Sequence, residues 1–192
     1  MTATHTAERH YTTGLTRENI ERALTEAGKN PRALSPQDLT SLEDCHSLGR
    51  IATAQLSQLA AVRAEDRVLD AGTGIGGTAR FLAAEIGCHV TGVDLTAEYC
   101  ETADWLNTAA GLSSCIDVRR ADVTELPFAD GTFDVVISQH VQMNVADKSR
   151  LYAETRRVLR PGGRLALWDA TAGPKQPIRF PLPWPPIPKT AT

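Results

Sequence analysis

Three aspartates, Asp70, Asp94 and Asp122, each stand at or just after the end of a short apolar segment, and a glycine-rich turn follows the first. That turn, GTGIGG at residues 72–77, would let the backbone come close to a bound molecule. The G-x-G-x-x-G spacing also occurs in dinucleotide sites, so by itself it does not identify the ligand. A P-loop is excluded because no Gly-Lys-Ser/Thr follows the turn.

The charges around this turn favour a cationic ligand that carries an adenosine. Asp70 stands two residues before the first glycine, where its carboxylate would repel a pyrophosphate but attract an ammonium or sulfonium group. The carboxylate of such a ligand could use backbone amides near Gly76. Asp94 could accept both ribose hydroxyls, which also suits NAD. Asp122 could accept from the exocyclic amine of adenine while Val123 offers a backbone amide, so the three acids together favour an adenosyl cation.

These residues need a scaffold that brings successive strand ends together, and the hydrophobic pattern predicts one. From residue 67 onward, short apolar runs alternate with segments of helical periodicity. This alternation predicts an α/β fold, with a Rossmann-like, doubly wound, mostly parallel sheet, helices on both faces and the ligand at the carboxyl ends of the strands. The predicted strands cover residues 67–71, 88–95, 115–122, 133–139 and 163–170, and the predicted helices cover 76–86, 97–111 and 147–159. RPGG, at 160–163, predicts a helix end and a turn.

The first third of the chain is predicted to form an N-terminal helical cover. We expect a first helix capped by Thr16 and ended by Gly28, and a second with Ser35 as its cap and Pro36 at its first position. A third helix would carry an apolar stripe formed by Leu48, Ile51, Ala52, Leu56 and Leu59. We therefore divide the chain into a cover at 1–62, a core at 63–173 and a tail at 174–192, whose prolines predict extended backbone.

The composition argues against several other classes of protein. The 192 residues carry a net charge of −3, which gives no basic surface typical of nucleic-acid binding. We find no signal peptide and no apolar run of about 18 residues, so we expect a cytoplasmic protein without stable membrane insertion. The four cysteines form no C-x-x-C pair, and we expect reduced thiols and no metal site; they are Cys45, Cys88, Cys100 and Cys115.

Four motifs in order resemble the class I S-adenosylmethionine-dependent methyltransferases: VLDAGTGIGG, VTGVDLT, ADVTELPFADGTFDVV and ETRRVLRPGGRLAL. The chain is most similar to the small-molecule branch, which includes glycine and sarcosine N-methyltransferases and quinone or sterol C-methyltransferases. EDCHSLGRIATAQL and SQHVQMNVADK resemble the sarcosine and dimethylglycine enzymes. The resemblance implies S-adenosylmethionine as the cofactor and methyl transfer to a small molecule, with an amine slightly favoured over a quinone, sterol or other lipid-like acceptor.

The resemblance also implies roles around the cofactor. The methionine moiety would be held by Asp70 and by the turn residues Gly72, Thr73, Gly74 and Gly76. Asp94 would bind the ribose and Leu95 would pack near the adenine. The polar edge of the adenine would meet Asp122 and Val123, and Gln139 would lie near the methionine end, with His140 beside the sulfonium.

His140 is the best-placed candidate for a general base, although a histidine here can equally pack and bond a backbone carbonyl. In-line methyl transfer depends mainly on positioning and exclusion of water, while a hydroxyl or carbon nucleophile would need a base. The other expected pocket residues are Tyr11, His46, Met143, Asn144 and Trp168. Tyr11 and His46 belong to the N-terminal cover, where an aromatic ring near a sulfonium is favourable.

The resemblance implies seven strands in the order 3-2-1-4-5-7-6, whereas this sequence provides for five and is expected to stop after the fifth. The fifth strand would then have an unpaired edge, which proteins usually cover. We expect the proline-rich tail or a second subunit around residues 164–188 to cover it, unless a longer gene has been cut short. The alternative functions are a protein that binds the cofactor without transferring its methyl group and, disfavoured by Asp70, an NAD-binding module.

Overall fold

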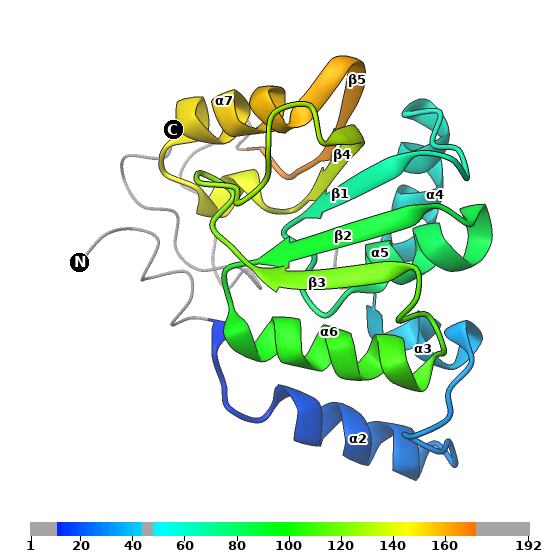
Figure 1. Ribbon diagram of the computed structural model, residues 1–192. Helices are drawn as coiled ribbons and strands as arrows, with labels where there is room; N and C mark the ends of the chain where they lie inside the picture. Colours follow the sequence, from blue (N-terminus) through cyan, green and yellow to red (C-terminus); the bar gives the residue numbers. More distant parts are fainter. Residues whose placement is uncertain (1–10, 44–47, 172–192) are drawn as a thin grey trace.

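Five strands form one parallel sheet in the order β3-β2-β1-β4-β5 (Figure 1). The computed structural model describes residues 11–43 and 48–171, so Cys45, His46 and the proline-rich tail lie outside the described residues. The strands are β1 (Arg67–Ala71), β2 (His89–Asp94), β3 (Ile116–Arg120), β4 (Phe133–Gln139) and β5 (Leu159–Trp168). The predicted Rossmann-like fold is confirmed, and the carboxyl ends of the strands meet at one edge.

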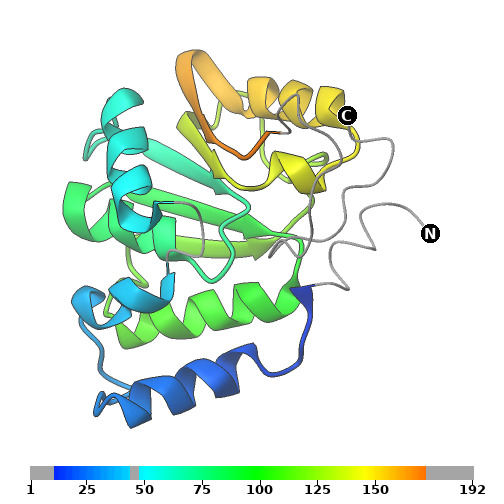
Figure 2. The same ribbon diagram turned by 180° about the vertical axis from the view of Figure 1, so that it is seen from behind.

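Helices cover both faces of the sheet, as predicted (Figures 1 and 2). After β1 comes α5 (Gly77–Phe81), continued by a π-helical turn, η1 (Leu82–Ile86); after β2 comes α6 (Ala97–Ala109), and α7 (Lys148–Val158) precedes β5. Successive strand residues face opposite sides. Val68 joins a core cluster with Leu82, whereas its neighbour Leu69 joins a cluster with Val158 of α7. The two clusters fix α5 and α7 on opposite faces.

Three helices precede the sheet: α2 (Thr16–Glu26), α3 (Pro36–Glu43) and α4 (Gly49–Leu59). In the packing of these helices, α2 contacts α6, α3 contacts α5 and α4 contacts β5. Leu24 of α2 and Leu39 of α3 are almost completely buried in one cluster with Leu106 of α6. The helices α2 and α3 are therefore joined to the sheet through the helices that cover it, whereas α4 contacts the sheet directly.

The predicted caps of these helices have different outcomes. The Ser35 cap of α3 is confirmed, because Ser35 Oγ accepts from the Asp38 backbone N–H at 3.3 Å and the Asp38 carboxylate accepts from the Ser35 N–H at 2.9 Å. The Thr16 cap is wrong, since Thr16 is already helical and the N-cap residue, Leu15, makes no side-chain cap bond. Instead, Thr16 donates its backbone N–H to Glu98 of α6 at 2.7 Å.

The apolar stripe expected on α4 is only partly buried. Leu48, Ile51 and Leu59 are 61%, 63% and 84% exposed. The buried positions of this helix are Ala52, Thr53, Leu56 and Ser57. Apart from Leu56, these are small, so the helix packs against the sheet through Leu56 and small residues and leaves Ile51 and Leu59 outside.

The fifth strand begins earlier than the sequence predicts. Phe133 pairs with Leu159, but Val135 pairs with Arg164, so the register shifts between these two pairs. Residues 160–163, which were predicted as a helix end and turn, form this irregularity within β5 instead. Among the described residues, β5 pairs with β4 alone.

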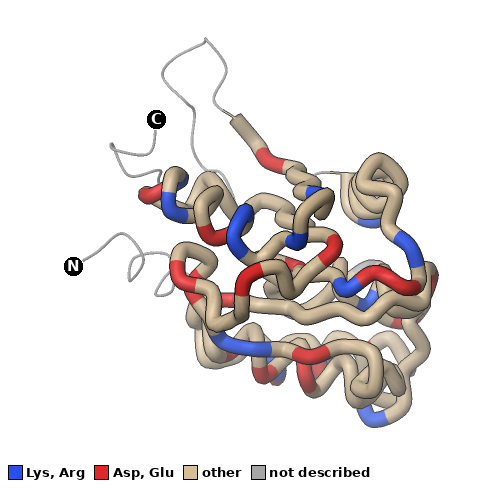
Figure 3. The backbone as a smooth tube through the Cα atoms, turned by 45° about the horizontal axis from the view of Figure 1, so that its top comes forward, with Lys and Arg blue, Asp and Glu red and all other residues tan. Residues whose placement is uncertain are grey.

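The described residues bear on the expectations for charge, membrane helices, metal groups and cysteines. Acidic and basic residues are interspersed along the described backbone (Figure 3). No described helix has both the length and the apolar character needed to cross a membrane. The same residues contain no group of three or more His, Cys, Asp or Glu side chains that could hold a metal ion. The described cysteines Cys88, Cys100 and Cys115 are free thiols.

Candidate functional site

The turn after β1 combines a tightly packed glycine with an open one. Gly72 has φ +86°, and a Cβ added there would overlap the side chain of Val141 from the loop after β4. Gly74 has φ +55°, and a Cβ there would meet nothing within 4 Å. Both conformations favour glycine. The turn therefore packs tightly against Val141 at Gly72, whereas at Gly74 it leaves space for an approaching ligand.

Most amides of the turn already have acceptors within the protein. Gly72 and Thr73 donate their N–H groups to the Val93 carbonyl of β2 at 2.8 and 2.9 Å. Gly76, whose amide was expected to face a ligand carboxylate, donates to the Thr73 carbonyl at 2.9 Å. These bonds hold the turn in one shape before any ligand arrives.

Asp70 lies beneath the turn rather than on its open side. Its side chain accepts a hydrogen bond from the Thr73 hydroxyl at 2.7 Å, and the residue is only 1% exposed. Burial raises the pKa of Asp70 to about 6; the Thr73 bond lowers it and the nearby charge of Asp94 raises it. Asp70 can therefore act on a ligand through its charge and through the shape of the turn, more than through direct contact.

Asp94 joins the end of β2 to the open part of the turn. Its Oδ2 accepts from the Gly74 N–H at 2.9 Å and its Oδ1 accepts from the Thr96 N–H at 2.9 Å. Burial raises the pKa of the Asp94 carboxyl, although these backbone bonds lower it. Because Asp94 remains half-buried and each carboxylate oxygen can accept a further bond, it is placed to meet a ligand beside Gly74.

The third aspartate shapes the turn that follows β3. Asp122 Oδ1 accepts from both the N–H and the hydroxyl of Thr124, at 2.8 and 2.7 Å. Its second oxygen, Oδ2, takes part in neither bond. Val123 is partly buried against the core cluster that contains Leu69, and the half-buried Leu95 accepts a bond from Arg120 through its carbonyl at 3.1 Å. The order of strands thus brings all three aspartates to the same edge of the sheet.

The end of β4 contributes a buried amide. Gln139 is 8% exposed, and its Nε2 donates to the hydroxyls of Thr78 and Thr53 at 2.7 and 3.3 Å. These bonds tie β4 to α5 and α4. Its Oε1 is also buried, and no described residue donates a hydrogen bond to it. A buried acceptor of this kind is unfavourable unless a donor reaches it.

The next residue, His140, has an unusual backbone. Its φ is +57°, in the left-handed region, and its N–H donates to the Trp168 carbonyl at 2.8 Å. Non-glycine residues in this conformation are uncommon and concentrate at functional sites. Trp168, at the end of β5, is partly buried against the main core cluster. His140 therefore starts the loop that follows β4 at a fixed place and in a strained conformation.

The start of the described chain meets this loop. Tyr11 accepts a hydrogen bond from Asn144 Nδ2 at 3.3 Å, and its ring lies 6.0 Å from that of Tyr99. Burial raises the pKa of the Tyr11 hydroxyl; the Asn144 bond lowers it and the charge of Asp94 raises it. Met143 lies half-buried in the short helix η2 (Gln142–Asn144). The structure thus brings Tyr11 and Asn144 into contact, and Asp94 lies close enough for its charge to act on Tyr11.

Sequence reasoning missed two residues that shape this site. Arg80 is 1% exposed and its guanidinium donates to Asn107 Oδ1 at 2.8 Å and to the Ile75 carbonyl at 2.6 Å, which ties the glycine turn to α6. The signal was present, because Arg80 is the one basic residue within a mostly apolar helical segment at 76–86. Glu98 holds the start of α2, and no local pattern marks it, since its partners lie more than 80 residues away in the sequence.

The comparisons with known proteins identify the family. A family profile described as a methyltransferase domain matches residues 69–167, half of the chain. The glycine/sarcosine/dimethylglycine N-methyltransferase of Actinopolyspora halophila is 35% identical over 133 residues, which are 69% of this chain and 24% of that protein. The sterol methyltransferase-like 1 protein of Botryococcus braunii is 34% identical over 120 residues, which are 62% of this chain and 31% of that protein.

Solved structures agree with this match. The structure of a geranyl diphosphate methyltransferase in complex with S-adenosylmethionine has a TM-score of 0.56 and 30% identity, over 62% of this chain and 49% of that chain. The chain thus spans about a quarter to about half of the length of these relatives. The matched profile, the strand order and the glycine turn with its acidic neighbours place the chain in the methyltransferase domain family, among the class I S-adenosylmethionine-dependent methyltransferases.

Proposed function

We propose that the protein binds S-adenosylmethionine and transfers its methyl group to a small-molecule acceptor. The observation that carries this proposal is the pair of carboxylates, the buried Asp70 and the half-buried Asp94, beside a glycine turn that is open at Gly74. Burial raises the pKa of both carboxyls, so an isolated negative charge is unfavourable at each. A cationic ligand would stabilise these negative charges, whereas a pyrophosphate would add further negative charge and repulsion.

The residues present fit this cofactor. Asp94 would accept from the ribose hydroxyls, and Asp122 Oδ2 together with Val123 would meet the adenine edge. Gln139 Oε1 is a buried acceptor that lacks a described donor, and the ammonium of the ligand would supply one. When bound, S-adenosylmethionine supplies an electrophilic methyl group on its sulfonium. Asp70 would favour that positive charge from beneath the turn.

The residues of the chain would then position the acceptor and exclude water. Tyr11 and Asn144 would close one side of the site through their hydrogen bond. His140, fixed by its bond to the Trp168 carbonyl, would accept a proton from an acceptor that must lose one. Holding the nucleophile in line at about 3–3.5 Å would supply most of the rate.

We propose an amine as the acceptor, in preference to a sterol or another lipid-like carbon nucleophile. The A. halophila relative is named for N-methylation of glycine, sarcosine and dimethylglycine, and this is the support for an amine. The B. braunii relative is named as a sterol methyltransferase, and its similar identity keeps that class as the second candidate.

We further propose that the protein works in the cytoplasm as a homodimer joined at β5. The support for the dimer is the strand edge, which has no partner among the described residues, next to the exposed side chains of Ile51 and Leu59 on α4 and Leu165 on β5. Size-exclusion chromatography with light scattering tests it. A monomeric mass at all micromolar concentrations would contradict the proposed dimer.

Calorimetric titration with S-adenosylmethionine, its demethylated product and NAD tests the function. We expect the first two to bind and NAD not to bind. Turnover is then measured with glycine, sarcosine, dimethylglycine and a sterol, by release of the demethylated product. Binding without turnover on any acceptor would favour a protein that binds the cofactor but does not transfer the methyl group. Binding of NAD alone would contradict the proposal.

A further inference from the structure

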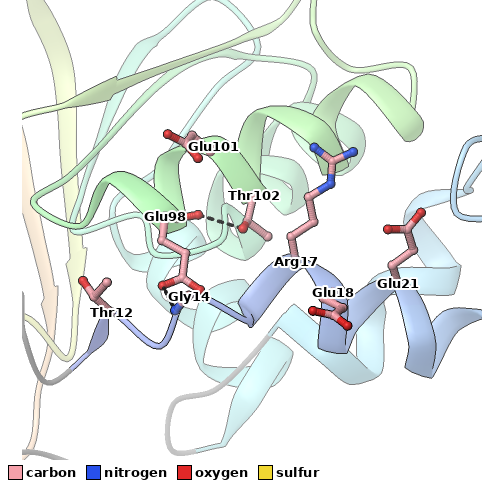
Figure 4. Close-up of a pocket in the computed structure, with 8 residues that line it drawn as sticks. All are labelled: Thr12, Gly14, Arg17, Glu18, Glu21, Glu98, Glu101 and Thr102. Carbon is pink, nitrogen blue, oxygen red and sulfur yellow. Dashed lines mark hydrogen bonds between the residues drawn. The ribbon is translucent and has the colours of Figure 1, made fainter.

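The residues just before α2 lie across the N-terminal end of α6, beside the tip of β2 (Figures 1 and 4). We call residues 11–16, which end at the first residue of α2, the strap. The groove between α2 and α6, about 450 Å³ in volume, is lined by residues of the strap and of both helices. One side chain of α6, Glu98, points from this groove directly at the strap (Figure 4).

The Glu98 carboxylate accepts hydrogen bonds from several backbone N–H groups of the strap. Its Oε2 accepts from the N–H groups of Thr13 and Gly14 at 2.8 and 2.9 Å. Its Oε1 accepts from the Thr16 N–H at 2.7 Å and from the Thr13 hydroxyl at 3.2 Å. Since α2 has no side-chain cap of its own, Glu98 takes the place of one.

The surroundings of the Glu98 carboxylate favour its negatively charged form. Burial raises the pKa of Glu98, but the hydrogen bonds from Thr16, Gly14 and Thr13 outweigh it and bring the pKa down to about 2. A negative charge at the first turn of α2 is also favourable for the helix dipole. Glu98 therefore stays ionised and bound to the strap at neutral pH.

The far end of the strap reaches the proposed cofactor site. Tyr11 packs near Tyr99, the residue after Glu98, and is bonded to Asn144 in the loop after β4. The charge of Asp94 acts on the Tyr11 hydroxyl, so the strap passes close to the carboxylate proposed to bind the ribose. Glu98 and Tyr11 thus anchor the two ends of the strap beside the tip of β2.

We propose that Glu98 is a positioning residue that latches the strap and so keeps Tyr11 over the bound cofactor. This rests on the proposed function, because Tyr11 closes the site only if the cofactor binds there. Loss of the latch frees the strap, lets the cofactor leave faster and admits water. The fold does not depend on it, because α2 also packs on α6 through Leu24 and Leu106 and through Arg17, whose guanidinium lies 4.9 Å from the Trp105 ring centroid.

The test uses the full chain with Glu98→Ala, Glu98→Gln and a matched control, Glu101→Gln. Glu101 lines the same groove on the same helix but points away from the strap (Figure 4). Glutamine at 98 keeps one acceptor oxygen and adds donors, so it should retain only part of the latch. Hydrogen exchange at the amides of Thr13, Gly14 and Thr16 reports the latch without any ligand.

We expect Glu98→Ala to weaken S-adenosylmethionine binding about tenfold, mainly through faster dissociation, with a smaller loss for Glu98→Gln and none for Glu101→Gln. Tyr11→Phe should also weaken binding, and it should add little in the Glu98→Ala background, because both changes release the same strap. The three strap amides should exchange faster in Glu98→Ala, while amides of the sheet keep their protection.

Other outcomes would contradict the proposal that Glu98 latches the strap. If Glu98→Ala lowers Tm but leaves cofactor affinity and dissociation unchanged, Glu98 only caps α2. The same holds if Tyr11→Phe and Glu98→Ala weaken binding independently. If the unaltered protein binds no S-adenosylmethionine, the proposed function fails, and with it the cofactor role of the strap. Unchanged exchange at the strap amides in Glu98→Ala would show that no latch exists, whatever the cofactor does.

Discussion

Replacing Asp70 by asparagine should make the unliganded protein more stable while weakening its affinity for the cofactor. Asp70 is 1% exposed, and burial raises its pKa from 3.8 to about 6. Because the pKa in the folded state lies above that of the unfolded chain, the carboxyl destabilises the fold once it is ionised. The stability that protonated Asp70 provides is complete below about pH 4 and is lost as pH rises through 6.

The size of the effect follows from that rise in pKa. At 1.36 kcal/mol per pKa unit, a rise from 3.8 to about 6 corresponds to about 3 kcal/mol at pH 8. Asparagine removes the charge and keeps a side-chain oxygen that can accept from Thr73. The free energy of unfolding of Asp70→Asn should thus increase by about 2–3 kcal/mol at pH 8, and Tm by about 4–12 °C. The gain should fall to about half at pH 5 and vanish near pH 3.

Thermal and denaturant unfolding of the unliganded protein at pH 8, 5 and 3.5 measure this gain, and calorimetry measures cofactor affinity. Asp66→Asn is the matched control, because Asp66 is also buried but pairs with Arg164 at 2.6 Å, so its loss should destabilise. A destabilised Asp70→Asn at pH 8, or a gain that does not change with pH, would refute the reasoning about buried charge. Unchanged cofactor affinity would refute the proposed attraction of a cation.

Three further predictions concern single positions. Asp94→Ala should weaken S-adenosylmethionine binding by about 1–3 kcal/mol in calorimetry, whereas the exposed Asp104→Ala should not. Gly72→Ala should lower Tm by several degrees, since φ is +86° and the new Cβ overlaps Val141; if Tm is unchanged, the turn is looser than described. His140→Ala should lower kcat about 10²–10⁴-fold and remove its pH dependence without changing cofactor affinity, if His140 acts as the base; an unchanged kcat would leave it a packing role.

The positions of the strands and of the acidic residues at their ends could be predicted from the sequence. The apolar runs that became β1 and β4, and the glycines after β1, are local patterns, so each can be recognised within a few residues. Asp70 and Asp94 lie at the ends of β1 and β2 and Asp122 follows β3, and parallel strands place their carboxyl ends together. These residues therefore meet at one edge in the structure as the sequence predicted.

What only the tertiary structure decided depends on contacts between distant segments. Sequence spacing places Asp70 beside the turn, but only the fold of the turn over it buries the carboxylate and raises its pKa. The bonds of Glu98 to the strap join residues 82 to 85 positions apart, and Arg80 reaches across to Asn107. Such pairs leave no periodic trace in the sequence, because either partner alone resembles an ordinary helix residue. The chain thus encodes its scaffold locally, while the burial of Asp70 and the attachment of the strap to α6 arise from packing between distant segments.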